Sequence, residues 1–129
     1  KKKSIEIKDE LPVSLSIKAD KNKIEQVFTN LIDNAIKFNK EKGFVRIYSQ
    51  DVNGKTIIIV EDSGIGIPKK DITRIFERFY RADKARSREL GGTGLGLSIV
   101  KHIIELHGGS IGVESAEDFG SKFWFLLPR

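Results

Sequence analysis

The segment Phe44–Ile67, FVRIYSQDVNGKTIIIVEDSGIGI, decides how this chain folds. Each half has the length and composition of a β-strand, and Asn53-Gly54 between them is the strongest short signal for a two-residue hairpin turn. The second half contains Ile57–Val60, a run of consecutive apolar residues that indicates a strand buried on both faces. We therefore predict a hairpin of residues 44–51 and 55–62 with a central second strand, followed by a glycine-rich loop at 63–67.

Amphipathic patterns on either side of this hairpin predict helices. Before it, apolar residues recur at the spacing of one helix face, at Ile24, Val27, Phe28, Leu31, Ile32, Ala35 and Ile36. Asn22, with Glu25 three residues on, resembles a capping box, and Gly43 is expected to end this helix. After the hairpin, Pro68 is placed to begin a second helix. Its buried stripe would be Ile72, Ile75, Phe76 and Phe79.

A third helix is expected further along the chain, from about Leu95 to Leu106. His107-Gly108-Gly109 has the composition of a helix end. The buried side of this helix would carry Leu95, Ile99, Ile103 and Leu106. Residues 82–93 before it lack periodicity and are expected to form a loop.

The two ends of the sequence complete the expected sheet. Residues 4–18 alternate apolar and polar and predict two short strands around Leu11-Pro12, while Ser110–Ser115 and Lys122–Leu127 predict a closing hairpin. This order of elements favours an α/β two-layer sandwich, with a mixed, mostly antiparallel sheet and three main helices on one face.

Length and composition restrict the class of protein. The chain has 129 residues, of which 39% are hydrophobic, so we expect residues 1–129 to form a single globular domain. No apolar run approaches the ~18 residues of a membrane span. There is no Cys, which excludes disulfides and thiolate metal sites. There is also no Met, even at position 1, so we expect the chain to be a piece of a longer protein.

The net charge of +5 is concentrated in one segment. Residues 69–88 contain eight basic and three acidic residues, and the remaining 15 basic and 15 acidic residues balance. The excess is therefore a local positive feature on an otherwise neutral chain, and not the overall basic character typical of nucleic-acid-binding proteins.

The first candidate site lies on the first predicted helix. Asn30, Asn34 and Lys37 are spaced four and three residues apart, so they share one helix face. Two amides and an ammonium group suit a hard cation and phosphate oxygens, but for this motif taken alone a solvated polar face is the more ordinary explanation of the same spacing.

The second candidate is Asp62-Ser63-Gly64-Ile65-Gly66, directly after the central strand. Glycines permit close approach of a ligand to the backbone. A carboxylate at this place can accept a hydrogen bond from the exocyclic amine of adenine, whereas guanine carries an acceptor oxygen at the same position. The alternative is a turn aspartate that binds its own backbone.

The third candidate is Gly91–Leu97, where four glycines in six residues precede the third helix. Backbone N–H groups there can surround an anion at a helix N-terminus. The spacing fits neither a P-loop nor a dinucleotide fingerprint. We therefore predict a phosphate-binding loop of another type.

Taken in order, these segments resemble the catalytic and ATP-binding domain of sensor histidine kinases, a branch of the superfamily shared with gyrase, the Hsp90 chaperone and MutL-type repair proteins. Residues 25–38 resemble the N box of that family, and residues 62–66 its G1 box. Residues 76–81, FERFYR, resemble its F box, and residues 92–97 its G2 box. The F box distinguishes the kinases from the other branches.

The resemblance implies an ATP site of the Bergerat type, with Mg2+ held by Asn34 and a contribution from Asn30. It places Lys37 and Arg81 near the phosphates as charge stabilisers, and Asp62 at the adenine amine. The remaining implied contacts to ATP are Phe38, Gly64, Gly66, Ile67, Tyr80, Gly92, Thr93, Gly94, Leu95, Gly96 and Leu97. Phe119–Phe123 reads FGSKF, where the family more often has Gly-Thr-x-Phe; the serine retains the hydroxyl.

The resemblance also implies partners and a location. The phosphoacceptor histidine of the family lies in a separate dimerisation domain, and neither His102 nor His107 has the sequence that marks it. This chain would therefore bind ATP and phosphorylate a histidine of that domain, from which a response regulator takes the phosphoryl group. We expect a cytoplasmic domain that contacts neither nucleic acid nor membrane, within a parent that can be membrane-anchored.

Other functions remain open from the residues alone. A serine kinase of the anti-sigma type belongs to the same superfamily, although the F box argues against it. A degenerate ATP-sensing module would retain the fold, although the intact Asn34, Asp62 and glycine set argues for a working site. A nucleic-acid-binding module is the simplest explanation of the basic segment, but no stacking array of aromatic residues accompanies the basic residues.

Overall fold

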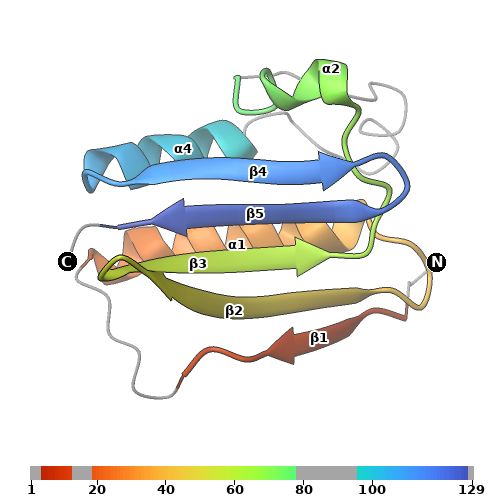
Figure 1. Cartoon of the computed structure of the whole chain (residues 1–129), viewed down its shortest axis with the longest axis horizontal. Helices are drawn as coiled ribbons and strands as arrows, with labels where there is room; N and C mark the ends of the chain where they lie inside the picture. Colours follow the sequence, from red (N-terminus) through yellow and green to blue (C-terminus); the bar gives the residue numbers. More distant parts are fainter. Residues whose placement is uncertain (1–3, 13–18, 78–95, 128–129) are drawn as a thin grey trace.

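The computed structural model describes residues 4–12, 19–77 and 96–127. Their strands form one five-stranded sheet in the order β1-β2-β3-β5-β4 (Figure 1). The strands are β1 (Glu6–Asp9), β2 (Phe44–Val52), β3 (Lys55–Asp62), β4 (Ser110–Ala116) and β5 (Gly120–Leu126). The helices are α1 (Lys21–Lys37), α2 (Lys69–Ile72) and α4 (Gly96–Leu106). The α/β fold with a mixed sheet is confirmed.

The hairpin that the sequence signals most strongly is present. β2 and β3 pair antiparallel, with Val52 opposite Lys55. The turn residues Asn53 and Gly54 have φ of 53° and 77°, the left-handed conformation that a tight hairpin turn requires. β3 lies between β2 and β5, and its residues Ile58, Ile59 and Val60 are all buried. The prediction of a central strand buried on both faces is therefore confirmed.

The core lies between the sheet and the two longer helices, which cover the same face of the sheet (Figure 1). Alternate residues of the central strands point into it, because successive side chains of a strand face opposite ways. Phe125 contacts Phe28 of α1 edge-on at a ring-centroid distance of 5.6 Å, and Phe123 contacts Phe76 at 6.1 Å. The single strand β5 thus contacts both α1 and the segment after α2.

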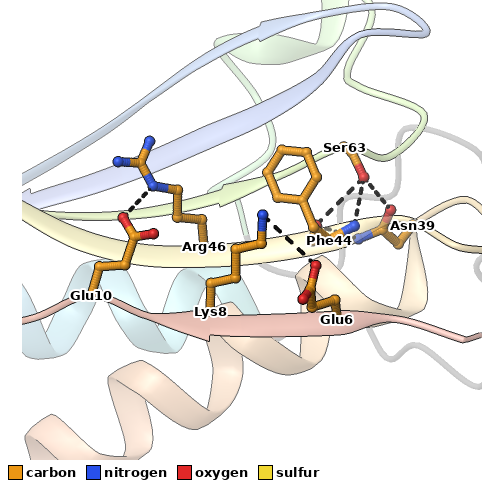
Figure 2. Close-up of polar contacts among 7 residues, drawn as sticks. All are labelled: Glu6, Lys8, Glu10, Asn39, Phe44, Arg46 and Ser63. Atoms are coloured by element: carbon orange, nitrogen blue, oxygen red, sulfur yellow. Dashed lines mark hydrogen bonds and ion pairs between the residues drawn. The ribbon is translucent and has the colours of Figure 1, made fainter.

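The edge strand β1 is the least buried element of the sheet. It pairs with β2 in parallel, and all four of its residues are exposed. Arg46 of β2 bonds Glu10 just beyond the strand, with Nε 2.5 Å from Oε1 (Figure 2). Only the first of the two strands predicted for residues 4–18 is observed; residues 13–18 lie outside the described residues.

Both predicted ends of the first helix are wrong. The N-cap is Asp20, whose carboxylate accepts a hydrogen bond from the backbone N–H of Lys23 at 3.1 Å, so the capping box does not start at Asn22. The helix ends at Lys37, well before Gly43. After it, the Asn39 side chain accepts a hydrogen bond from the Lys40 N–H through Oδ1 and donates one from Nδ2 to the Phe44 carbonyl. These bonds hold the turn of the chain that leads into β2.

The observed cap gives a direct test of where the helix begins. Asp20→Ala is expected to lower the free energy of unfolding by about 1 kcal/mol, because it removes the acceptor for one N-terminal N–H group of α1. Asn22→Ala should change it by less than ~0.5 kcal/mol. Urea unfolding measures both values. A larger loss for Asn22→Ala than for Asp20→Ala would place the cap at Asn22 after all.

The second helix is shorter than its pattern suggests. α2 is a single turn, and Pro68 is its N-cap and not its first helical residue. Of the predicted stripe, Ile75 is buried and Phe76 packs on the core, as expected. Phe79 lies outside the described residues.

The third predicted helix is observed as α4, but of its buried residues only Ile103 belongs to the predicted buried side. Its buried residues are Val100, Ile103 and Ile104, whereas Leu106 is 67% exposed. Leu106 lies two residues beyond Ile104, about 200° further round the helix, so it points away from the face that is buried. The C-terminus is as predicted: Gly108 has φ of 75°, and the Gly109 N–H bonds the Ile104 carbonyl at 2.9 Å, which is a Schellman motif. No helix in the described ranges is long and apolar enough to cross a membrane.

Candidate functional site

Asp62 is a buried carboxylate at the end of the central strand. It is 7% exposed. Two backbone N–H groups face it: that of Gly64 bonds Oδ1 at 2.8 Å, and that of Ser121 also bonds the carboxylate. Burial nevertheless dominates, and it raises the pKa of Asp62 to about 6, with a smaller contribution from the neighbouring Glu61 charge. A carboxylate held in this way is a strong acceptor for a buried hydrogen-bond donor.

This burial makes the stability of the chain pH-dependent. The folded pKa of about 6 lies above the ordinary value of 3.8, so the folded chain holds this proton more tightly than the unfolded chain. The contribution of Asp62 to the free energy of unfolding is most favourable below the unfolded pKa. It decreases by about 3 kcal/mol in total as the pH rises through the folded pKa.

Urea unfolding between about pH 4 and pH 7 measures this effect. The wild-type chain should lose the stated stability relative to Asp62→Asn, which has no proton to titrate at this position. Parallel pH profiles for the two chains would contradict the assignment.

The loop after β3 is packed against the end of α1. Gly64 has no room for a side chain, because a Cβ atom there would overlap the carbonyl oxygen of Phe38, the C-cap of α1. The same carbonyl accepts a hydrogen bond from the Ile65 N–H at 3.0 Å. Gly64 is therefore required for close packing, and the loop and the end of α1 form one unit.

A buried amide anchors the first residue of this loop. Asn39 is fully buried, and its Oδ1 accepts a hydrogen bond from the Ser63 hydroxyl at 3.0 Å (Figure 2). Ser63 Oγ in turn accepts the Phe44 N–H at 2.8 Å. The end of β3, the start of β2 and the segment after α1 are joined at this point.

The turn between β4 and β5 holds the other side of the loop. Gly66 has φ of 72°, and a Cβ atom there would overlap the Ala116 carbonyl. The Ile65 carbonyl accepts the Asp118 N–H at 2.7 Å, and the Ile67 N–H bonds the Ser115 hydroxyl at 2.8 Å. The glycine loop is thus fixed on both sides before any ligand binds.

The predicted polar face of α1 points towards the start of α4. Asn30 donates from Nδ2 to the Gly96 carbonyl at 3.3 Å, which leaves Oδ1 as an oxygen acceptor. Asn34 lies one turn further along α1 and is half-buried. Lys37 pairs with Asp33 at 3.6 Å on the surface, an i,i+4 ion pair of the kind that exchanges readily with solvent.

The structure places α1 next to both the Asp62 loop and the described end of the third predicted group. The Asp62 loop adjoins the C-terminal end of α1, and the Asn30 face adjoins Gly96 at the start of α4. Leu97 and Ile67 pack against the core. Tyr80, Arg81, Gly92, Thr93, Gly94 and Leu95 lie outside the described residues.

Three supporting residues were not among the predicted site residues. Asn39 and Ser115 hold the glycine loop, and Ser121 lies directly opposite Asp62 on β5. Of these three, only Ser121 has a signal in the sequence, because it stands at the hydroxyl position of the FGSKF segment. Gly120 beside it is also constrained: it has φ of 94°, and a Cβ atom there would overlap the Asp62 carbonyl.

Comparison with known proteins places this arrangement in a family. Residues 19–129 match the family described as histidine kinase-, DNA gyrase B-, and HSP90-like ATPase. The chain belongs to this family. It is 50% identical over 117 residues to the sensor histidine kinase WalK of Bacillus subtilis, covering 88% of this chain and 19% of WalK. It is 46% identical over 114 residues to ArlS of Staphylococcus aureus, covering 88% and 25% respectively. The chain thus spans a quarter or less of these kinases.

Solved structures agree with this membership. A mycobacterial sensor histidine kinase, MprB, has a TM-score of 0.85 and 29% identity, covering 96% of this chain and 83% of that one. Full-length ShkA in complex with AMPPNP has a TM-score of 0.81 and 33% identity, covering 97% and 26%. Histidine kinase ThkA in complex with the response regulator TrrA has a TM-score of 0.75 and 35% identity, covering 96% and 34%. Within the family, this chain corresponds to the catalytic, ATP-binding part of two-component sensor kinases.

Proposed function

We propose that this chain binds Mg-ATP and transfers its γ-phosphoryl group to a histidine on a separate dimerisation domain. The observation that carries the proposal is the buried Asp62 carboxylate, held by the Gly64 N–H group at 2.8 Å beside a loop fixed on both sides. Burying a carboxylate destabilises a protein unless a partner compensates, and the exocyclic amine of adenine is such a partner.

The adenine end of the site follows from this carboxylate. Adenine offers a donor at position 6, whereas guanine offers an acceptor oxygen that an ionised carboxylate repels. Gly64 and Gly66 keep the backbone close and free of side chains. Ile67, at the end of this loop, packs against the core, and Phe38, the C-cap of α1, adjoins Gly64.

The phosphate end lies towards the start of α4. A magnesium ion would be held through the amide oxygen of Asn34, with Asn30 contributing, because Mg2+ takes oxygen ligands from few protein groups and from the substrate phosphates. This donor set fits: Asn30 uses its Nδ2 on Gly96, so its Oδ1 can face a cation. When bound, Mg2+ supplies charge neutralisation for the transferred phosphoryl group.

The chain itself contributes positioning and charge. Lys37 can turn from its exposed pair with Asp33 towards the phosphates, and Arg81 with the Gly92–Leu97 backbone would complete the phosphate contacts. An imidazole nitrogen of the acceptor histidine attacks the γ-phosphorus in line. The bond to the bridging oxygen breaks and ADP leaves. The attacking nitrogen belongs to the other domain, and we assign no base in this chain.

The proposed partners follow from this reaction. The acceptor histidine lies on the dimerisation domain of the same kinase, and a response regulator then takes the phosphoryl group; the ThkA–TrrA complex supports this step by similarity. We place the domain in the cytoplasm, within a parent kinase that can be membrane-anchored, and without direct contact to membrane or nucleic acid.

A transfer experiment tests the proposal. The chain is mixed with γ-labelled ATP, Mg2+ and a separately produced histidine-bearing dimerisation domain of a related sensor kinase. We expect label on that domain that is lost in acid and retained in base, as for phosphohistidine. Acid-stable label would instead indicate a serine kinase, and ATP binding without any transfer to several such domains would indicate a nucleotide-sensing module.

A further inference from the structure

Ser115 of β4 lies at the centre of a hydrogen-bond cluster beside Asp62. Its Oγ is within hydrogen-bond distance of three groups in the described part of the chain: the Ile67 N–H at 2.8 Å, the Gly120 carbonyl at 2.9 Å and the Ser121 hydroxyl at 2.8 Å. Ser121 is directly opposite Ser115 on one side and Asp62 on the other. The three side chains therefore form a row across β4, β5 and β3 on the helix-covered face of the sheet.

The chemistry of a hydroxyl group decides the direction of each bond in this cluster. The Ile67 N–H can only donate, and the Gly120 carbonyl can only accept. A serine hydroxyl has one proton, so Ser115 donates that proton to Gly120 and accepts from Ile67. Its contact with Ser121 can then be made only if Ser121 donates. The proton of Ser121 is thus directed at Ser115, so the Ser121 hydroxyl can act only as a hydrogen-bond acceptor towards a bound ligand.

We propose that Ser115 is a positioning residue that makes the Ser121 hydroxyl an acceptor beside Asp62, and so strengthens the selection of adenine over 6-oxopurines. This inference rests on the proposed function. A carboxylate and a hydroxyl that both accept suit the amine at position 6 of adenine, which has two protons to donate. They disfavour the 6-oxo group of hypoxanthine, which can only accept.

Removing Ser115 should change the preference between nucleotides more than the affinity for ATP. In Ser115→Ala the Ser121 proton is released and can turn towards the ligand, where it can donate to a 6-oxo group. The ratio of the Kd for inosine triphosphate to the Kd for ATP should fall about tenfold, the effect of one hydrogen bond. Ser115→Thr retains the hydroxyl and should restore the wild-type ratio.

The measurement is displacement of a fluorescent ATP analogue from the whole chain by each triphosphate in the presence of Mg2+. Ser110→Ala, an exposed position at the other end of β4, is the matched control and should leave both values unchanged. In a Ser121→Ala background, Ser115→Ala should no longer alter the ratio, because the two changes act through the same hydroxyl.

Two results would overturn the inference while leaving the proposed function intact. Either Ser115→Ala weakens both nucleotides equally, as a merely structural residue would, or it alters neither. If the alanine variant fails to fold, Ser115→Cys decides, because a thiol keeps the shape but bonds weakly; an unchanged ratio there also overturns it. A wild-type chain that binds neither triphosphate would instead reject the proposed function itself.

Discussion

Asp62→Asn is expected to lower the affinity of the chain for ATP about 100-fold. A hydrogen bond to a charged group contributes about 1.5–3 kcal/mol, and the asparagine amide can place its own NH2 group against the adenine amine, which adds repulsion. Each 1.4 kcal/mol corresponds to a factor of ten in Kd. The same substitution should stabilise the free protein at neutral pH, because it removes a buried charge whose pKa is raised to about 6.

Glu61→Gln is the matched control for this substitution. Glu61 is the preceding residue on β3, so its side chain points to the opposite face of the sheet, where it pairs with Arg46 at 3.7 Å. Glu61→Gln removes one negative charge from the same strand end on the face away from the proposed site. We expect it to change the affinity for ATP less than threefold. Equal losses for the two variants, measured by titration with ATP at fixed Mg2+, would show that only the overall charge matters.

The opposite effects of Asp62→Asn on stability and on binding are characteristic of a functional residue. A residue retained for structure would lower stability when replaced, whereas this one is expected to raise it. A buried carboxylate lowers the stability of the free protein, and a ligand that supplies a hydrogen-bond donor for it stabilises the complex. ATP should therefore stabilise the wild-type chain against urea more than it stabilises Asp62→Asn.

The sequence predicts well those parts of the fold that are determined by residues adjacent to one another in the chain. Asn53-Gly54 strongly favours a tight turn with positive φ at both residues, which is the conformation observed, so the β2–β3 hairpin could be located from two residues. The apolar run of β3 has no polar face to expose and must therefore be central. Asp62 and its glycines follow this strand immediately, and their place in the site comes with it.

The predictions that are wrong or missing concern features determined by residues far apart in the sequence. Asn22 and Asp20 are both good N-caps, but it is Asp20 whose backbone N–H also bonds Nε2 of the distant His107, at 3.1 Å. Leu106 belongs to the stripe predicted for the third helix, but α4 buries the side that carries Val100, Ile103 and Ile104, so Leu106 is exposed. Ser115 could not be identified from sequence at all, because its role depends on the register that sets it opposite Ser121.

Gly66→Ala is expected to have the largest effect on the proposed site after Asp62→Asn. The residue has φ of 72°, and a Cβ atom would overlap the carbonyl oxygen of Ala116, the last residue of β4 before the β4–β5 turn. The left-handed conformation costs alanine about 1–2 kcal/mol, and relief of the overlap adds about 1–3 kcal/mol. The glycine loop must then move away from the turn that holds it, so binding of ATP should fall by at least tenfold at a urea concentration where the variant is still folded.

Gly54→Ala separates these two contributions. Gly54 has nearly the same backbone conformation, with φ of 77°, but nothing lies within 4 Å of the added Cβ atom. It should lose only the conformational part of the free energy of unfolding, about 1–2 kcal/mol, and keep full affinity for ATP. The difference between the two variants then measures how tightly the loop is packed on the turn. If Gly66→Ala is no less stable than Gly54→Ala and binds ATP normally, the loop can move away from the turn without consequence, and the turn does not position the adenine end of the site.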